Sequence, residues 1–211
     1  HVSIRRQRQM CKETDIQDYI KSFLSHFPEN ANQQPWEIKK LEEILTNKIQ
    51  QLSDDYRIEG NVAIHKSATV EKGVTLKGTI IISENCFIGA HAYLRGPIFL
   101  TNSVIVGPGS EVKQAILFEK SAIAHFNFVG NSLIGENVNF EAGSICANHY
   151  NERIVKNFCK SQDQIISTGV TKFGALVGDD SKIGANAVLS PGTILEQNFI
   201  VDRLELVKQI D

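Results

Sequence analysis

The 211-residue chain lacks the features that mark disulfide-rich, nucleic-acid-binding or membrane proteins. It has four cysteines and none in C-x-x-C spacing, which argues against the common zinc and disulfide frameworks. The formal net charge is only -2, so no basic excess favours nucleic acid or an acidic membrane surface. No apolar run approaches the roughly 20 residues that span a bilayer, and the start shows no secretory signal pattern. The composition therefore predicts a cytoplasmic protein with neither nucleic-acid nor membrane partners.

What the chain does have is a ladder of apolar residues spaced by six. The ladder comprises Ile58, Ile64, Val70, Leu76, Ile82, Ile88, Leu94, Leu100, Val106, Val112, Phe118 and Ala124. A second, mostly small or aliphatic position lies two residues before each member. An α-helix needs a period near 3.6 and a lone strand a period of 2, so this pattern predicts short strands that turn at regular corners. It is the hexapeptide repeat of a parallel β-helix, whose coils bury their inward side chains against one another.

The ladder resumes twice after interruptions. Its second phase is Phe128, Ile134, Phe140 and Cys146, and its third is Val177, Ile183, Leu189, Leu195 and Val201. With three hexads to a triangular coil, the pattern predicts a mainly β fold of about seven coils over residues 54–203. Cys86 and Cys146 fall on interior positions, so we expect reduced core thiols. A long loop is expected at residues 147–176, and a C-terminal tail at 204–211.

Residues 12–53 follow a helical period instead. Thr14 and Gln17 make a possible capping box, and apolar residues recur at helical spacing from Ile16 to Phe27 and again from Ile38 to Leu52. The pattern predicts a helical hairpin that covers the first coil of the β-helix. The alternative is that the hairpin is a surface for a partner or for oligomerisation. Residues 1–11 are expected to be a disordered leader.

Three basic residues lie eighteen positions apart, each directly after a ladder residue. They are Lys77, Arg95 and Lys113. With eighteen residues to a coil, they should stack on one face about 4.8 Å apart. Stacked cations repel unless an anion lies among them, and Arg and Lys are the usual ligands of phosphate. The alternative is three solvated surface side chains.

His125 lies where the first phase of the ladder ends, at a hexad that counts only four residues. We expect this shortening to place the imidazole at a corner beside the basic column, where it could act as a general base. The long loop that follows Cys146 carries further basic residues, among them Lys172, and could close over an anionic ligand. A histidine alone is more often structural than catalytic.

Several segments around these residues resemble one family of acetyltransferases. The segments are Leu94-Arg95-Gly96, Glu111-Val112-Lys113, His125 to Gly130, Ile134 to Asn139 and Ala142 to Asn148. They are similar to the left-handed β-helix domain at the C-terminus of bifunctional N-acetylglucosamine-1-phosphate uridylyltransferases. The long loop is most similar to the archaeal sugar-1-phosphate nucleotidyltransferases. The resemblance covers about residues 56 to 203.

The resemblance implies a homotrimer of left-handed coils with active sites between subunits. It implies acetyl-CoA as acyl donor and an amino-sugar 1-phosphate, or a related nucleotide sugar, as acceptor. Carried over by position, His125 would be the catalytic base. The implied substrate-binding positions are Lys77, Arg95, Lys113, Phe128, Asn139 and Asn148. The implied CoA-binding positions are Arg153, Lys156, Gly184, Ala185 and Arg203, with a backbone N-H near Gly184 and Ala185 as the donor to the oxyanion.

The chain departs from this family at two positions and leaves two other functions open. Phe128 replaces the usual tyrosine and Ala185 the usual serine. No nucleotidyltransferase domain is expected before Ile58, so a separate nucleotidyltransferase is a possible partner. A non-catalytic, regulatory trimer that binds a sugar nucleotide is one alternative. A γ-class carbonic anhydrase is the other, but it requires three converging histidines, and hexad counting separates those of this chain, so no metal is predicted.

Overall fold

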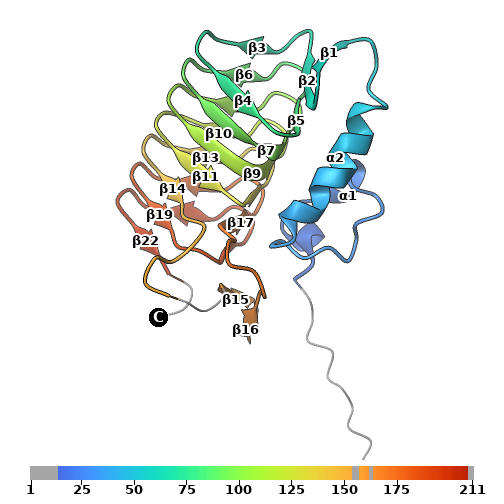
Figure 1. Cartoon of the computed structure of the whole chain (residues 1–211). Coiled ribbons are helices and arrows are strands. Elements are labelled where there is room, and N and C mark those ends of the chain that lie inside the picture. The colour runs from blue at the N-terminus through green and yellow to red at the C-terminus, as the bar shows by residue number, and fades with distance from the viewer. Residues whose placement is uncertain (1–13, 154–156, 162–163, 209–211) are drawn as a thin grey trace, which may run out of the picture.

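The computed structural model describes residues 14–153, 157–161 and 164–208. The chain winds into a triangular stack of parallel strands, and a short helical segment lies along one flank of the stack (Figure 1). The leader expected at residues 1–11 lies outside the described residues. The parallel β-helix expected from the six-residue period is confirmed.

Each coil contributes one strand to each of three faces. The seven-stranded face consists of β3 (Thr69–Val70), β6 (Phe87–Ile88), β8 (Ile105–Val106), β10 (Ala122–Ile123), β13 (Asn139–Phe140), β18 (Lys182–Ile183) and β21 (Ile200–Val201). The helix-covered face consists of β2 (Val62–His65), β5 (Ile80–Ile82), the ends of β7 (Tyr93–Leu100) and β9 (Glu111–Leu117), β12 (Leu133–Ile134), β17 (Ala175–Val177) and β20 (Thr193–Leu195). The third, which we call the cation face, consists of β4 (Thr75–Lys77), the beginnings of β7 and β9, β11 (Phe128–Gly130), β14 (Ile145–Cys146), β19 (Val188–Leu189) and β22 (Leu206–Val207).

The inward ladder residues form one continuous core. Ile82 and Leu100 lie eighteen residues apart in adjacent strands, and both are completely buried. Cys86 and Cys146 are also interior, and burial raises the pKa of their thiols to about 11 and about 12. Their free thiols agree with the expectation of reduced core cysteines.

The phase predicted between Val112 and Ile134 is wrong. Leu117, Ile123 and Val129 face the interior, one residue away from the predicted Phe118, Ala124 and Phe128 in each case. The expected single hexad of four residues at His125 is replaced by two hexads of five, which end at Leu117 and Ile134. The first shortening follows Lys113, where the backbone of Gln114 adopts a positive φ of 48° and the corner closes with one residue fewer than the corner after Arg95.

Both ends of the predicted β-helix also shift. Ile58 is not a ladder residue: it belongs to β1 (Tyr56–Glu59), which pairs antiparallel with β2, and it is 44% exposed. The tail expected at 204–211 begins instead with the last strand, because β22 pairs with β19 and extends the ladder to Val207.

The helices are shorter than the periodicity suggested. The structure has a 3-10 turn η1 (Ile16–Asp18), α1 (Phe23–His26), a second 3-10 turn η2 (Ile38–Lys40) and α2 (Leu41–Ile49). Asp15 caps η1 by accepting a hydrogen bond from the backbone of Gln17, so the proposed Thr14–Gln17 capping box is wrong. No helix in the described part of the chain is long and apolar enough to cross a membrane.

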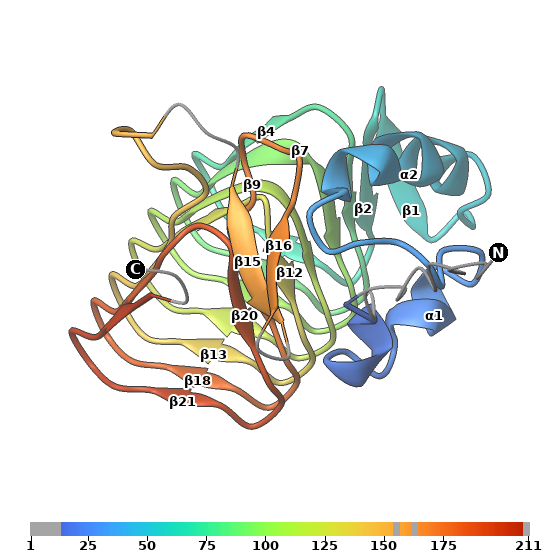
Figure 2. The same ribbon diagram turned by 90° about the horizontal axis from the view of Figure 1, so that it is seen from below.

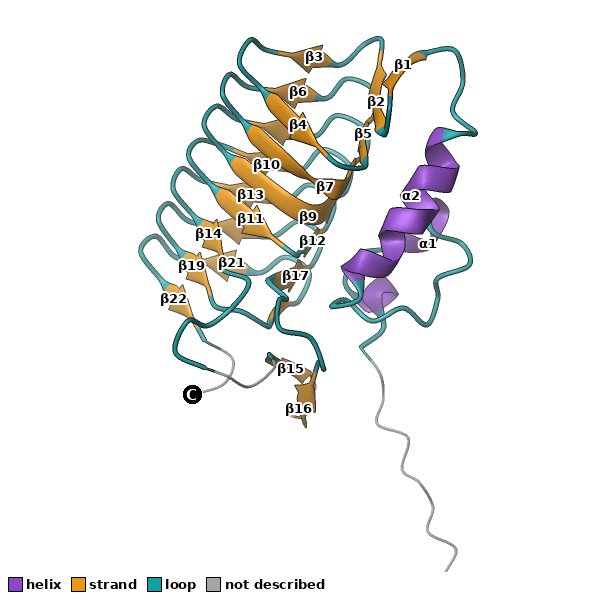
Figure 3. Cartoon of the chain, in the orientation of Figure 1, coloured by secondary structure: helices purple, strands orange, loops and turns teal. Residues whose placement is uncertain are grey.

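The helical segment covers a flank of several coils, which corrects the expectation that it covers the first coil (Figures 2 and 3). The strands of this face point apolar side chains outward as well as inward. Ile81, Phe99, Ile116, Leu133, Leu176 and Ile194 form a second core with the helical residues. A sheet face that is apolar on its outside needs such a cover.

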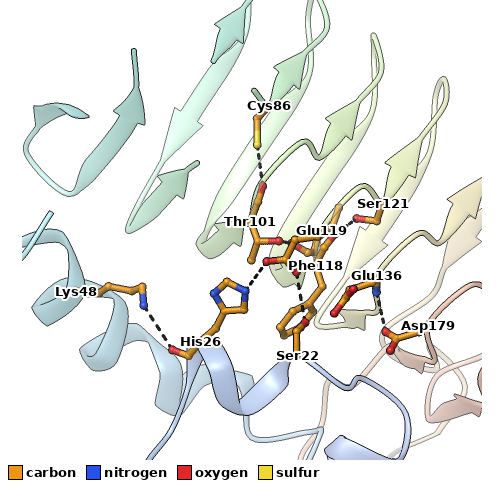
Figure 4. Close-up of polar contacts among 11 residues, drawn as sticks. Ser22, His26, Lys48, Cys86, Thr101, Phe118, Glu119, Ser121, Glu136 and Asp179 are labelled. Atoms are coloured by element: carbon orange, nitrogen blue, oxygen red, sulfur yellow. Dashed lines mark hydrogen bonds and ion pairs between the residues drawn. The ribbon is translucent and has the colours of Figure 1, made fainter. Parts of the chain in front are cut away.

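Polar contacts fix the segment to the flank (Figure 4). The His26 Nε2 lies 2.6 Å from a carboxylate oxygen of Glu119. Asp179 accepts hydrogen bonds from the backbone N-H groups of Lys21 (3.0 Å) and Glu136 (2.8 Å). Its carboxylate therefore joins the helical segment to two coils.

The long loop contains structure of its own. β15 (Phe158–Ser161) and β16 (Gln164–Ser167) form an antiparallel hairpin beside the last coils (Figure 2). Asn157 anchors the loop, since its side-chain amide donates to the carbonyls of Asn148 and Phe173. The loop thus returns to the β-helix close to where it left.

Candidate functional site

The basic column forms as the spacing predicted. Lys77 pairs in register with Arg95, and Arg95 with Lys113, on three adjacent strands of the cation face. The ring of Tyr93 contacts the first two, with Lys77 Nζ and Arg95 Cζ each 5.2 Å from its centroid. Cation–π attraction to this ring helps to hold the two side chains in place.

Arg95 makes only part of its possible hydrogen bonds. Its guanidinium forms an ion pair with Glu111 of the next strand, and both side chains are about one-third exposed. Its Nε is buried and has no partner. This N-H donor is unsatisfied, but because it is buried an anion could reach it only after the surrounding side chains move.

Lys172, which the sequence placed only in a basic loop, joins this column. Burial and the charges of Lys172 and Arg95 lower the pKa of Lys113. We call Arg95, Lys113 and Lys172 the cation cluster. The position after Lys113 in the column is Gly130, over which the ring of Phe128 and the amide of Asn148 lie. The column thus ends in a glycine, and the next cation is supplied by the loop.

The expectation that His125 lies beside the basic column is wrong, because the structure places it at the opposite end of the cation face from Lys113. It is exposed at the corner between β10 and β11, three residues before Phe128. Phe128 pairs with Glu111, and Gly130 with Lys113, so Glu111 lies between the imidazole and the cation cluster. Since strands rise about 3.3 Å per residue, His125 and Lys113 are on the order of 10–15 Å apart within one chain.

Asn148 is a structural residue in this conformation. It is 6% exposed and donates its side-chain amide to Asn131, which in turn donates to Gln114. These three residues lie seventeen apart, at one corner of successive coils. A ligand could reach Asn148 only by competing with this column of hydrogen bonds.

Three of the five positions expected to bind CoA, Gly184, Ala185 and Arg203, lie together along one edge of the seven-stranded face. Gly184 and Arg203 line a groove of about 460 Å³, and Asn139, expected to bind substrate, lies there too, apart from the cation cluster. Glu141 accepts hydrogen bonds from the backbone N-H of Ala185 (2.9 Å) and from Arg203 (2.7 Å for Nε). These bonds to Arg203 and Ala185 lower the pKa of Glu141. The N-H expected to stabilise an oxyanion is therefore engaged by a carboxylate.

The remaining predicted positions are in the long loop. Arg153 lies 4.0 Å from the centroid of the Tyr150 ring and 3.8 Å from the carboxylate of Glu152. Lys156 lies outside the described residues. Among the described residues there is no group of three metal-binding side chains.

The sequence comparisons agree with this geometry. Residues 58–171, more than half of the chain, match the family model of the GMPPB C-terminal domain. The chain belongs to this family. Residues 174–202 match the hexapeptide repeat of succinyl-transferase, a repeat of the left-handed β-helix.

The curated relatives confirm the resemblance stated from the motifs. A bifunctional sugar-1-phosphate nucleotidylyltransferase/acetyltransferase of Sulfurisphaera tokodaii is 34% identical over 74% of this chain and 38% of its own length. A bifunctional protein GlmU of Methanococcus maripaludis is 41% identical over 79% of this chain and 41% of its own length. The chain thus spans about two fifths of the length of these relatives.

One solved structure is similar at lower identity. It is a variant of a GDP-perosamine N-acetyltransferase from Caulobacter crescentus in complex with CoA and GDP-perosamine, with a TM-score of 0.35 and 16% identity. The match covers 82% of this chain and 65% of that one.

Proposed function

We propose that this protein is an acetyl-CoA-dependent N-acetyltransferase whose acceptor is an amino sugar that carries a phosphate. The observation that carries the proposal is the cation cluster on a face of the β-helix whose far corner exposes His125. Arg95 and Lys113 would bind the phosphate, with Lys172 above them and Lys77 at the edge. The relatives named for acetyltransferase activity support this assignment.

The reaction needs orientation, a proton acceptor and an oxyanion donor, but no nucleophilic side chain. The amine nitrogen attacks the thioester carbon, so a C-N bond forms and the C-S bond breaks. His125 accepts the proton that the nitrogen loses, and the thiolate of CoA leaves and is protonated. The site would bind acetyl-CoA along the groove that contains Gly184 and Arg203.

We propose that the active unit is a homotrimer in the cytoplasm. Phe126 supports this, because its side chain follows His125 at the corner and is 76% exposed. Leu204, three coils later at the same corner, is 79% exposed. A subunit packed on these side chains would bring its own cation face or seven-stranded face close to His125. A separate nucleotidyltransferase is the proposed source or consumer of the sugar phosphate.

The test is a thiol-release assay with acetyl-CoA and a panel of amino-sugar phosphates. His125→Asn should lower kcat by about 100-fold or more, the usual contribution of a general base. The matched control is His91→Asn, since His91 is also an exposed histidine at this corner but lies on an earlier coil. Equal activity of the two variants would refute the role of His125.

A non-catalytic sugar-nucleotide-binding protein is the second candidate. The observation in its favour is the carboxylate of Glu141 on the Ala185 N-H, which would have to move before that N-H could serve an oxyanion. A protein that binds phosphorylated sugars but releases no thiol from acetyl-CoA with any of them would favour this candidate.

A further inference from the structure

A second cavity adjoins the cation cluster from the side of the helical segment. It has a volume of about 630 Å³, within the range of cofactor and nucleotide sites. Its lining comes from three parts of the chain: Trp36, Glu37, Ile38 and Lys40 from the helical segment, Asn131 from a coil corner, and residues 168–172 from the long loop. A β-helix without the helical segment would lack one wall of this cavity.

Two contacts place the cavity next to the proposed phosphate site. Lys172 lines the cavity, and its ammonium is close enough to Lys113 to lower the pKa of that residue. Asn131, also in the lining, donates its backbone N-H to the carbonyl of Lys113 at 2.7 Å. The cation cluster therefore lies at the edge of the cation face that adjoins this cavity, and His125 lies at the opposite end of the same face.

The positions of the cation cluster, His125 and the cavity restrict which acceptor the site can bind. A phosphate bound at the cluster has the amino sugar on one side, toward His125, and the cavity on the other. We infer that the cavity binds the nucleoside of a nucleotide-linked amino sugar, whose diphosphate lies on Arg95, Lys113 and Lys172. The inference rests on the proposed function and narrows its acceptor from sugar phosphates in general to nucleoside diphosphate sugars.

The lining has the chemistry that a nucleoside needs. Trp36 is half-buried and packs edge-on against Phe173 at 6.0 Å, which fixes an indole in the wall as a stacking partner for a base. Glu37 can accept hydrogen bonds from ribose hydroxyls or base N-H groups. The negative charge of Glu37 is balanced by Lys40, whose Nζ lies 2.5 Å from the Glu37 carboxylate. Lys172 adds a further positive charge to the lining.

The chain offers a direct optical test, because Trp36 is its only tryptophan. Titration of the whole chain with UDP, GDP or dTDP should change the emission of Trp36. Glucosamine 1-phosphate, which has a phosphate but no nucleoside, should bind more weakly and leave the emission nearly unchanged. If no nucleoside diphosphate alters the emission, the inference is wrong.

A bulky side chain placed at the rim of the cavity gives a second test of the inference. Thr171 is exposed, so Thr171→Phe should fill the cavity without disturbing the core and raise the Kd of the best nucleoside diphosphate by about tenfold or more, the scale of one lost base stack. Thr69→Phe is the matched control, at an exposed position of the first coil. Circular dichroism checks that both variants fold. An unchanged Kd in Thr171→Phe would overturn the inference.

Kinetics separate this inference from the proposed function. With acetyl-CoA, a nucleotide-linked amino sugar should have a kcat/KM at least about tenfold above that of the corresponding amino-sugar 1-phosphate. Equal values would refute the inference and leave the acetyltransferase intact. If neither acceptor released thiol from acetyl-CoA but nucleoside diphosphates still changed the emission of Trp36, the proposed acetyltransferase activity would be refuted and the nucleotide-binding site would stand.

Discussion

Phe99 is the residue on which the attachment of the helical segment most directly depends. It belongs to β7, between the inward residues Ile98 and Leu100, and its ring points outward into the second core. It contacts the rings of His26 (5.4 Å) and Phe27 (6.0 Å), and Lys48 Nζ lies 5.5 Å from its centroid. Phe99→Ala should therefore loosen the helices and leave the interior of the β-helix packed.

The size of the effect follows from burial. Phe99 is 3% exposed, so the substitution Phe99→Ala removes an almost fully buried ring from the second core. Burying an aromatic side chain removes about 150–250 Å² from water, which at about 25 cal/mol/Å² corresponds to about 4–6 kcal/mol. Measured Phe→Ala substitutions in cores cost about 3–5 kcal/mol. Since about 1.4 kcal/mol is a factor of ten, a cost of about 3–5 kcal/mol should make local opening of the helical segment about 100- to 4,000-fold more frequent.

Amide hydrogen exchange measures local opening separately for each helix and strand. In Phe99→Ala the amides of α2 should lose protection, while those of the central strands change much less. Leu100→Ala is the matched comparison on the same strand: it removes an interior residue and should weaken the strands. Phe199→Ala, at a residue already 40% exposed, should have a smaller effect than either. If Phe99→Ala lowered protection uniformly along the chain, the helical segment and the β-helix would be one cooperative unit and the reasoning would fail.

Three further predictions follow from the electrostatics and the close backbone contacts. Burial and neighbouring cations lower the pKa of Lys113, so the affinity for an anion such as inorganic phosphate should fall as pH rises through that lowered value; in Lys172→Gln the loss should shift to higher pH, which a binding titration between pH 7 and 11 would detect. Burial raises the pKa of Glu119, but its hydrogen bonds and the charge of His26 outweigh this and lower it overall. A depressed carboxyl pKa contributes stability that is present above the unfolded value and lost as pH falls through the folded value, so acid melts of Glu119→Gln should show less pH dependence than the wild type. In Gly107→Ala the new Cβ would lie 1.3 Å from a backbone oxygen of the next coil, so this variant should lower the Tm by about 10 °C or more or fail to fold. A thermal melt with no shift would contradict the contact.

The fold could be predicted because its signal is repeated in every coil. Each inward residue covers the one below, so a period of six with a beat of two survives local exceptions. The phase error has a local cause: Ile116, Leu117 and Phe118 are all apolar, and either Leu117 or Phe118 satisfies the period. Only the shortened corner after Lys113 decides between them, and a backbone turn of this kind leaves little trace in composition.

The position of the helices left a signal that the ladder alone does not use. In β5, Ile80, Ile81 and Ile82 are all apolar, and on this face the residue before the ladder residue is apolar in every coil, whereas on the seven-stranded face it is Thr69, Asn139 or Lys182 in three coils. Runs without alternation indicate strands buried on both sides, so they mark the face that needs a cover. No comparable pattern in the sequence indicated that Lys172 lies beside Lys113. Its place beside Lys113 depends on the path of a loop that lies outside the repeat.

The shortened corner connects the fold to the site. Loss of one residue in successive coils brings Gln114, Asn131 and Asn148 into a hydrogen-bonded column seventeen residues apart, and the column fixes the point where the long loop departs. The loop returns through Lys172, beside Lys113, and encloses the cavity together with Trp36. The same change of phase turns Phe118 outward, where it packs against Phe23 of α1 at 6.2 Å and helps to hold the helical segment that carries Trp36. The wall of the cavity and the cation beside it therefore have one structural origin, which a regular eighteen-residue coil would not provide.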